Sequence, residues 1–311
     1  MVAAQRCCAC VDRSAVAPAL DRQQPYRRCA TTGHAWQRRL RPWRACAADS
    51  RGSFRKNERD LLAIQLDDRA VLLTRWWQLL RSVVEHSKDP ALQQIAHVTR
   101  HWDGRASTDS ASYRIVRQFR SKTIEAVEAG LLAPAKAALG AEFLPPRRAQ
   151  LEGIVWPLLQ QRPAHLLSPA VASWEQLLDD AARSAQSDLI AEDAQSEPRG
   201  QHTWGQRNTA AICHPIARAL PALAKRWLCM PSDQLPGDRD MPRVQGPAFG
   251  ASERMVVSPG HEQDGIVHMP GGQSGHPLSP FWGAGHDDWV HGRPTPFLPT
   301  ATRYTLQLRP Q

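Results

Sequence analysis

The stretch MPGGQSGHPLSPFW, residues 269–282, contains three glycines, two serines, a histidine and three prolines in 14 positions. Gly272, Gln273, Ser274 and Gly275 begin a nucleophile-elbow pattern, but His276 stands where G-x-S-x-G requires its second glycine. Prolines at positions 277 and 280 exclude the helix that would follow such an elbow. We therefore expect a glycine-rich turn in which backbone segments pass closely, rather than a catalytic serine.

Histidine and carboxylate residues near the C-terminus raise the question of a metal site. None of them has the two-ligand spacing of an H-E-x-x-H helix, so we expect separate histidines in loops. The residues concerned are His261, His268, His276, His286, His291, Asp287 and Asp288.

The loop from Pro236 to Asp240 places two carboxylates beside Arg239. It could bind calcium or supply an acid and a base, but a salt-bridged loop is the more common outcome. Ser121-Lys122 lacks the spacing of a Ser-x-x-Lys site. We assign no catalytic and no metal-binding residue in the chain.

Residues 1–54 have a composition unlike the rest of the chain. Five of the seven cysteines and nine arginines fall within the first 50 residues, which contain no lysine or glutamate. Three interpretations are open. Cys7, Cys10, Cys29 and His34 could bind zinc; the segment could be a disordered extension; or it could be a GC-rich gene segment translated in a shifted frame, which we favour. The odd, clustered cysteine count does not indicate a disulfide framework.

The net charge of +9 would suggest nucleic acid as a partner, but nine Arg and three Asp give residues 1–50 a charge of +6, which leaves +3 for the remaining 261 residues. We therefore expect no nucleic-acid partner. The sequence has no run of about 18 apolar residues, so no membrane partner is expected. We see no export signal and leave the localisation unknown.

Hydrophobic periodicity predicts a mainly helical region over residues 55–190 and a β-rich region over 191–311. Helices are expected from Leu72 to about Lys88, and over 91–101, 112–132, 151–160 and 173–185, the last capped by Ser173 and Gln176. The segments ERMVVSP (253–259), GIVHMP (265–270) and RYTLQLRP (303–310) alternate like strands. The predicted fold class is α+β.

Several segments, in order, resemble the C-terminal half of the β chain of the penicillin acylases over about residues 55–310. They are LLAIQLDDRAVLLTRWW, HWDGRASTDSASYRIVRQFR, SWEQLLDDA, TWGQRNTAAICHPIARALP, LPGDRDMPRVQGPAFGASERMVVSPG, MPGGQSGHPLSPFW and DDWVHGRPTPFLP. The most specific are TWG-x-x-N with the following HP and LP, and GGQSG-x-P-x-SP.

The resemblance implies a four-layer αββα sandwich and an N-terminal-nucleophile hydrolase of linear amides. In that family a serine exposed by self-cleavage attacks, its own α-amino group is the base, and an asparagine and a backbone N–H bind the oxyanion. Substrates are N-acyl β-lactams or acyl-homoserine lactones, a link to antibiotic metabolism. Complete relatives are often periplasmic, and a structural calcium is common.

The sequence departs from the family pattern where catalysis would occur. The α chain and the Ser-Asn-Asn-like start of the β chain are missing, so no catalytic residue and no calcium ligand are carried over. Trp204, Gly205, Asn208, His214 and Pro215 are interpreted as a strand and turn, and Gly272, Gln273, Ser274 and Gly275 as a tight element of the same sheet.

The expected function is that of a penicillin acylase fragment that is inactive alone. The alternative is a non-catalytic module that complements a separately encoded fragment, with the missing α chain and N-terminal β segment as partners. Open strand edges also lead us to expect that the isolated chain aggregates.

Overall fold

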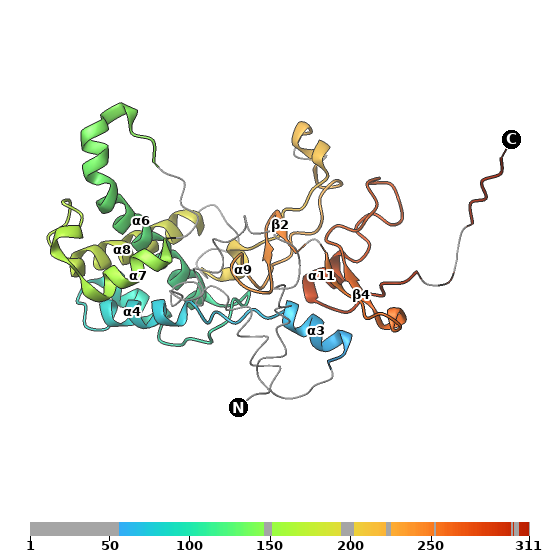
Figure 1. Ribbon diagram of the computed structural model, residues 1–311, viewed down its shortest axis with the longest axis horizontal. Coiled ribbons are helices and arrows are strands. Elements are labelled where there is room, and N and C mark those ends of the chain that lie inside the picture. The colour runs from blue at the N-terminus through green and yellow to red at the C-terminus, as the bar shows by residue number, and fades with distance from the viewer. Residues whose placement is uncertain are drawn as a thin grey trace, which may run out of the picture. The chain divides into compact units, whose positions relative to one another are not determined.

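The computed structural model describes residues 56–145, 151–193, 202–221, 225–251, 253–299, 301 and 305–310. The predictions for residues 1–54, including the zinc ligands and the disorder, lie outside these residues. Within them, helices predominate and two small antiparallel sheets follow, which confirms the α+β class (Figure 1).

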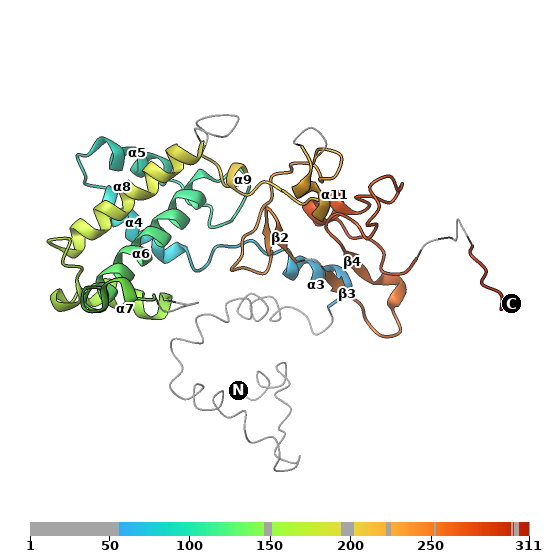
Figure 2. The ribbon, with the colours of Figure 1, turned by 90° about the horizontal axis from the view of Figure 1, so that it is seen from above.

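Five α-helices make up most of the region up to residue 193. They are α4 (Thr74–Val84), α5 (Pro90–Val98), α6 (Ala111–Leu139), α7 (Glu152–Gln161) and α8 (Trp174–Asp193), preceded by α3 (Glu58–Gln65). The helices expected from the periodicity are all present. Figures 1 and 2 both show α4, α6, α7 and α8 side by side.

Helix ends follow the local capping chemistry. Asn57 and Asp60 form a capping box at α3, and the Ser110 hydroxyl accepts from Tyr113 N at the start of α6. The predicted Ser173 cap is present, because its hydroxyl accepts from Gln176 N at 3.1 Å. Such caps satisfy N–H groups that have no partner within the helix.

Helix α6 extends seven residues beyond the predicted end at Leu132, to Leu139. Pro134 lies inside it, where the missing N–H removes the hydrogen bond to Gly130. The surrounding segment LLAPAKAAL is rich in alanine and leucine, which favour helix strongly enough to continue past the proline.

The helical region is held by one large apolar cluster. Trp76 is fully buried and contacts Phe119 and Trp156 edge-to-face, with ring centroids 6.2 and 5.2 Å away. The other fully buried members of this cluster are Phe119, Leu80, Leu92, Ala106, Val116, Val155, Ala182 and Ala185. Trp204 and Met241, which follow the helices in sequence, also belong to it.

Glu152, the first residue of α7, ties three helices together. Its carboxylate accepts from Trp76 Nε1 at 2.7 Å and Arg120 Nε at 2.8 Å, and it pairs with Arg75. Burial would raise the pKa of Glu152, but the charges of Arg120 and Arg75 and the hydrogen bonds from Arg75 and Trp76 lower it. The carboxylate is therefore ionised at neutral pH.

The C-terminal part contains short elements around a second apolar cluster. Its strands are β1 (Gln245–Gly246), β2 (Phe249–Gly250), β3 (Arg254–Val256) and β4 (Ile266–His268), followed by α11 (His286–His291). β3 pairs antiparallel with β4, with Met255 opposite Val267. The second cluster consists of Ala210, Leu235, Trp289 and Val290, with Ile212 against it.

The remaining elements are the short helix α9 (Trp204–Arg207) and the 3₁₀ turns η3 (Gly140–Glu142), η4 (Ala164–Leu166), η5 (Pro215–Ala219) and η6 (Glu262–Asp264). Within the described ranges, no helix is long and apolar enough to span a bilayer.

Two of the three predicted strands are confirmed and one is wrong. ERMVVSP contains β3 and GIVHMP contains β4. Residues 305–310 of RYTLQLRP have no regular structure, and Leu306 and Leu308 are 85% and 88% exposed. The alternating pattern is present, but among the described residues no strand pairs with 305–310.

Candidate functional site

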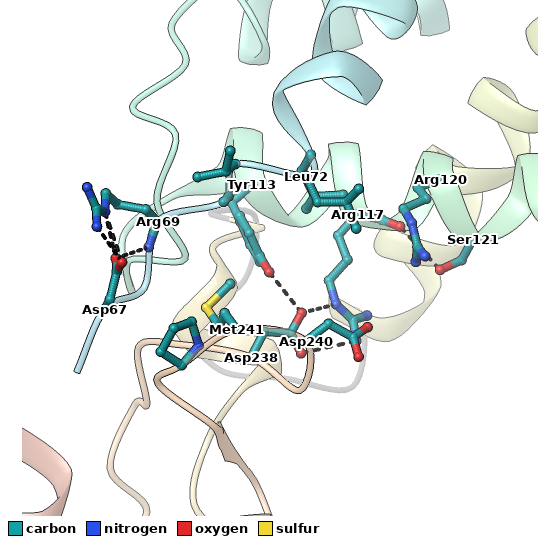
Figure 3. A pocket seen from close by; sticks show the side chains of 14 residues that line it. Asp67, Arg69, Leu72, Tyr113, Arg117, Arg120, Ser121, Asp238, Asp240 and Met241 are labelled. Atoms are coloured by element: carbon teal, nitrogen blue, oxygen red, sulfur yellow. Dashed lines mark hydrogen bonds and ion pairs between the residues drawn. The ribbon is translucent and has the colours of Figure 1, made fainter. Parts of the chain in front are cut away.

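Two side chains of α6 converge on the loop that follows Leu235. Tyr113 and Arg117 are four residues apart and lie on one face of the helix. The Tyr113 hydroxyl donates to Asp238 Oδ2 at 2.8 Å, and the Arg117 guanidinium pairs with both oxygens of Asp238. Figure 3 shows both side chains pointing at this carboxylate.

The surroundings fix the protonation states of Tyr113 and Arg117. Burial and the charge of Asp238 raise the pKa of Tyr113 well above its usual value. Burial lowers the pKa of Arg117, but the charge and hydrogen bond of Asp238 outweigh this and raise it. At neutral pH Tyr113 is a neutral donor and Arg117 is a cation, so neither can act as a base.

A small cavity of about 100 Å³ adjoins these residues. Asp67, Arg69, Arg120 and Ser121 line it, together with Asp240 (Figure 3). Pockets for drug-sized ligands are roughly 300–1,000 Å³, so this cavity suits water or a very small polar molecule. The geometry is that of a structural junction.

The loop 236–240 is salt-bridged, as expected, but its partner is Arg117 on α6. Arg239 contributes its backbone N–H, which donates to Asp238 Oδ1 at 2.7 Å. Among the residues that the structure describes, no group of three or more His, Cys, Asp or Glu could hold a metal ion.

Trp204 and Gly205, interpreted above as part of a strand, form the start of α9, which corrects that interpretation. Thr203 and Gln206 make a capping box that begins the helix. Trp204 is buried among α6 residues, with the Tyr113 ring 5.0 Å away edge-to-face and the Arg117 guanidinium 5.0 Å from its ring. The local capping box therefore starts a helix at this position.

Backbone hydrogen bonds join α9 to the segment before α6. Trp204 N donates to Ser110 O at 3.0 Å, and Gly205 N donates to Thr108 O at 2.7 Å. A Cβ at Gly205 would lie 2.7 Å from the same Thr108 oxygen. Glycine at this position thus permits the two backbones to approach.

Asn208 connects α9 to the loop that carries Asp238. Its side-chain Nδ2 donates to the carbonyls of Leu235 at 2.7 Å, Gln245 at 3.1 Å and Gly237 at 3.2 Å. Trp204 Nε1 donates to the same Gly237 oxygen at 2.8 Å. Asn208 is 2% exposed, so these bonds compensate for its burial.

His214 and Pro215 begin a 3₁₀ turn. The His214 Nδ1 accepts from Ile216 N at 3.2 Å, and Pro215 occupies the first position of η5. Cys213 and Cys229 form a disulfide. The sequence did not predict this pair, because the odd total and the five cysteines near the N-terminus did not indicate disulfides.

The glycine-rich motif is a turn, as expected, but it is not an element of a sheet. Gly272 has φ +71°, and a Cβ there would lie 2.9 Å from Ala284 N and O. Gln273 and Gly275 are exposed, and the Ser274 hydroxyl accepts from His276 N at 3.4 Å. No base is seen to activate Ser274 in these contacts.

The histidines have separate local partners, but the prediction that they lie in loops is wrong for three of them, because His268 is in β4 and His286 and His291 are in α11. His286 Nδ1 accepts from Gly271 N at 3.2 Å, and His268 Nε2 bonds the Arg293 carbonyl at 2.7 Å. His276 Nδ1 accepts from Leu278 N. His291 pairs with Asp287 across one turn of α11.

Arg254 is a buried cation that the sequence gave no reason to select. It is 2% exposed, and its NH1 donates to Trp289 O at 2.8 Å near the end of α11. Burial, and to a smaller degree the charge of Arg243, lower its pKa to about 9. Its Nε and NH2 have no hydrogen-bond partner. The partial negative charge of the carbonyls near the end of α11 partly compensates the charge of the Arg254 guanidinium.

Taken together, these residues define a structural class: an α+β chain whose prominent motifs form packing junctions. Comparison with known families identifies it further. The model of the penicillin amidase family matches residues 13–304, so the chain belongs to that family. The match also takes in residues 13–54, which the composition set apart. No curated protein matches the chain.

Proposed function

We propose that this chain forms part of an amide hydrolase of the penicillin amidase type. The observation that carries the proposal is the family match over residues 13–304. Under this proposal the substrates are linear N-acyl amides, such as N-acyl β-lactams or acyl-homoserine lactones, and the described elements belong to an αββα sandwich.

The role proposed for this chain within the enzyme is structural. Trp204, Asn208 and Tyr113 are buried, Arg117 is partly buried, and their hydrogen bonds go to Asp238 and to the backbone of the loop that carries it. Such a junction can hold two parts of a hydrolase in place, but it offers no activated nucleophile. We therefore propose that the chain alone does not hydrolyse amides.

The alternative role is a complementation module. In that case a separate polypeptide supplies the N-terminal serine with its α-amino base and the oxyanion donors, and this chain completes the fold around them. The two roles differ in one respect, which is whether activity returns when such a polypeptide is added.

The test begins with the purified chain and a chromogenic N-acyl anilide. We expect no release of the anilide above the buffer rate. A penicillin acylase that lacks the C-terminal part of its β chain is then refolded with this chain. Restored hydrolysis would support the complementation role.

Two controls make the test decisive. An Asp238→Asn variant should complement less well, because its ion pair with Arg117 is lost. An Asp240→Asn variant, which changes an exposed carboxylate two residues away, should behave like the parent chain. Hydrolysis by the purified chain alone, at a rate proportional to its concentration, would contradict the proposed absence of activity.

A further inference from the structure

Two loops of the C-terminal part place large apolar side chains in solvent. In the segment between the disulfide cysteines, Trp227 is 67% exposed and Ile216 55%. In the glycine- and proline-rich segment, Leu278 is 88% exposed and Phe281 54%. Single exposed apolar residues are common, but four on two neighbouring loops need an explanation.

Contacts between side chains and backbone show that the two loops are neighbours. The His214 ring lies 6.0 Å from the ring of Trp282. A Cβ built at Gly271 would lie 3.6 Å from the Ile212 side chain, and one at Gly283 would lie 3.2 Å from the sulfur of Met230. The segments on either side of the disulfide therefore contact both ends of the glycine-rich segment.

The charged side chains within the two loops all have one sign. Arg218, Lys225 and Arg226 are exposed on the disulfide-closed loop, and the Arg226 guanidinium lies 5.3 Å from the ring of Trp227. The sequence has no Asp or Glu between residues 213 and 229, or between 265 and 286. A partner with negative charge is therefore favoured over a second copy of the chain.

We propose that these two loops bind the surface of an anionic lipid bilayer. The surface, called here the two-loop surface, comprises Ile216, Trp227, Leu278 and Phe281 with the basic residues Arg218, Lys225 and Arg226. This inference is independent of the proposed amide hydrolysis.

The residue types favour a bilayer over an acidic protein. Peripheral membrane sites combine Trp, Phe and Leu side chains with flanking Lys and Arg, so that the apolar groups enter the interface while the cations meet anionic headgroups. Lysine is depleted at protein–protein interfaces, whereas here Lys225 is two residues from Trp227. The absence of a long apolar run does not oppose this mode, because a peripheral site does not span the bilayer.

The experiment is flotation of the full chain with lipid vesicles, which separates bound protein from aggregates that sink. Vesicles of phosphatidylcholine mixed with phosphatidylglycerol should carry the chain upward at low salt, and vesicles of phosphatidylcholine alone should not. High salt should reduce the binding, because exposed charges are screened.

Paired variants test the assignment to this surface. Trp227→Ser with Leu278→Ser should lower the partition coefficient by more than roughly tenfold, as expected for two inserted apolar side chains. Its control is Leu144→Ser with Phe249→Ser, two exposed apolar residues elsewhere, at 84% and 63%, which should leave binding unchanged.

Charge is tested in the same way. Arg218→Gln with Lys225→Gln should weaken binding by more than roughly tenfold, since each basic residue near an anionic surface contributes about a fivefold factor. Lys88→Gln with Lys136→Gln changes the net charge equally at distant exposed sites and should have little effect. No flotation, equal flotation with both lipids, or equal losses in the control pairs would overturn the proposal.

Discussion

At the scale of single residues, the ion pair of Asp238 with Arg117 can be tested by a single substitution. The side chains are 14% and 33% exposed, so the pair is partly buried. Asp238→Asn removes the carboxylate that pairs directly with Arg117, while the guanidinium stays packed on Trp204. Because removal of one partner leaves an uncompensated charge, we expect a loss of about 2–3 kcal/mol in the free energy of unfolding.

Urea denaturation followed by circular dichroism measures this loss. Asp240→Asn changes an exposed carboxylate two residues away and should cost less than about 0.5 kcal/mol. A similar effect of the two variants would mean that Asp238 contributes only general surface charge.

Glycine conformation provides a second test at this scale. Gly237 has φ +88°, and a Cβ there would lie 2.2 Å from the backbone oxygen of Arg243. Gly237→Ala should therefore destabilise the chain by more than about 2 kcal/mol, since backbone strain alone costs about 1–3 kcal/mol. Gly275, which has open space and no positive φ, is the matched control for thermal denaturation. A stable Gly237→Ala variant would contradict the close approach.

Motif residues were easier to find from the sequence than their partners. Trp204, Gly205 and Asn208 were selected because of a family pattern, and their burial explains why those types are needed. The Asp238 interaction with Tyr113 joins residues 125 positions apart, and no local period can report such a pairing. Arg254 was missed for a related reason: a lone arginine in a strand pattern reads as a surface residue.

At the scale of elements, the Glu152 contacts predict a dependence of stability on pH. The pKa of this carboxyl is lowered in the folded state, so the unfolded chain binds the proton more strongly. The stabilisation is therefore complete above the unfolded pKa of about 4.3 and is lost as pH falls through the lower folded pKa. Stability measured by urea denaturation should decline below that unfolded value.

The Glu152→Gln variant distinguishes the contribution of this carboxylate to the pH dependence of stability from the contributions of the other acidic residues. The variant should be less stable than the parent at neutral pH, because Arg75 and Arg120 lose their counter-charge. The difference between the two proteins should shrink as the pH is lowered. A constant difference over the whole range would show that Glu152 acts through packing and not through its charge.

Elements with a long, regular period were predicted well, and short ones were not. Helix α8 has both the apolar stripe and a Ser173 cap, so type and start were correct. The two-residue strands β1 and β2 are too short to show alternation, and α11 begins and ends at glycines with positive φ. The conformation of these short elements depends on tertiary contacts. One example is the Trp289 side chain of α11, whose Nε1 donates to Ala251 O, next to β2, at 2.8 Å.

At the scale of the whole molecule, the separation of the apolar residues into two clusters predicts how the chain unfolds. The larger cluster spans the helices and takes in Trp204 and Met241, whereas the smaller one contains Ala210, Leu235, Trp289 and Val290. The disulfide between Cys213 and Cys229 lies in the part with the smaller cluster, where Cys213 is three residues from Ala210.

Removal of the disulfide should therefore unfold one part before the other. A cross-link that closes a loop of this length contributes about 3 kcal/mol in the loop-entropy account. In a Cys213→Ser, Cys229→Ser variant, hydrogen exchange should rise at Ala210 and Met230, whose backbone N–H groups bond to Asp233 and Ile212 beside the loop. It should also rise in α11, which supplies Trp289 and Val290 to the smaller cluster. The amides of α4 and α6 should keep their protection, because their cluster does not include the cross-link. Equal loss of protection in α6 and α11 would show that the two clusters form one cooperative unit, joined through Trp204 and Asp238 more tightly than their separate packing implies.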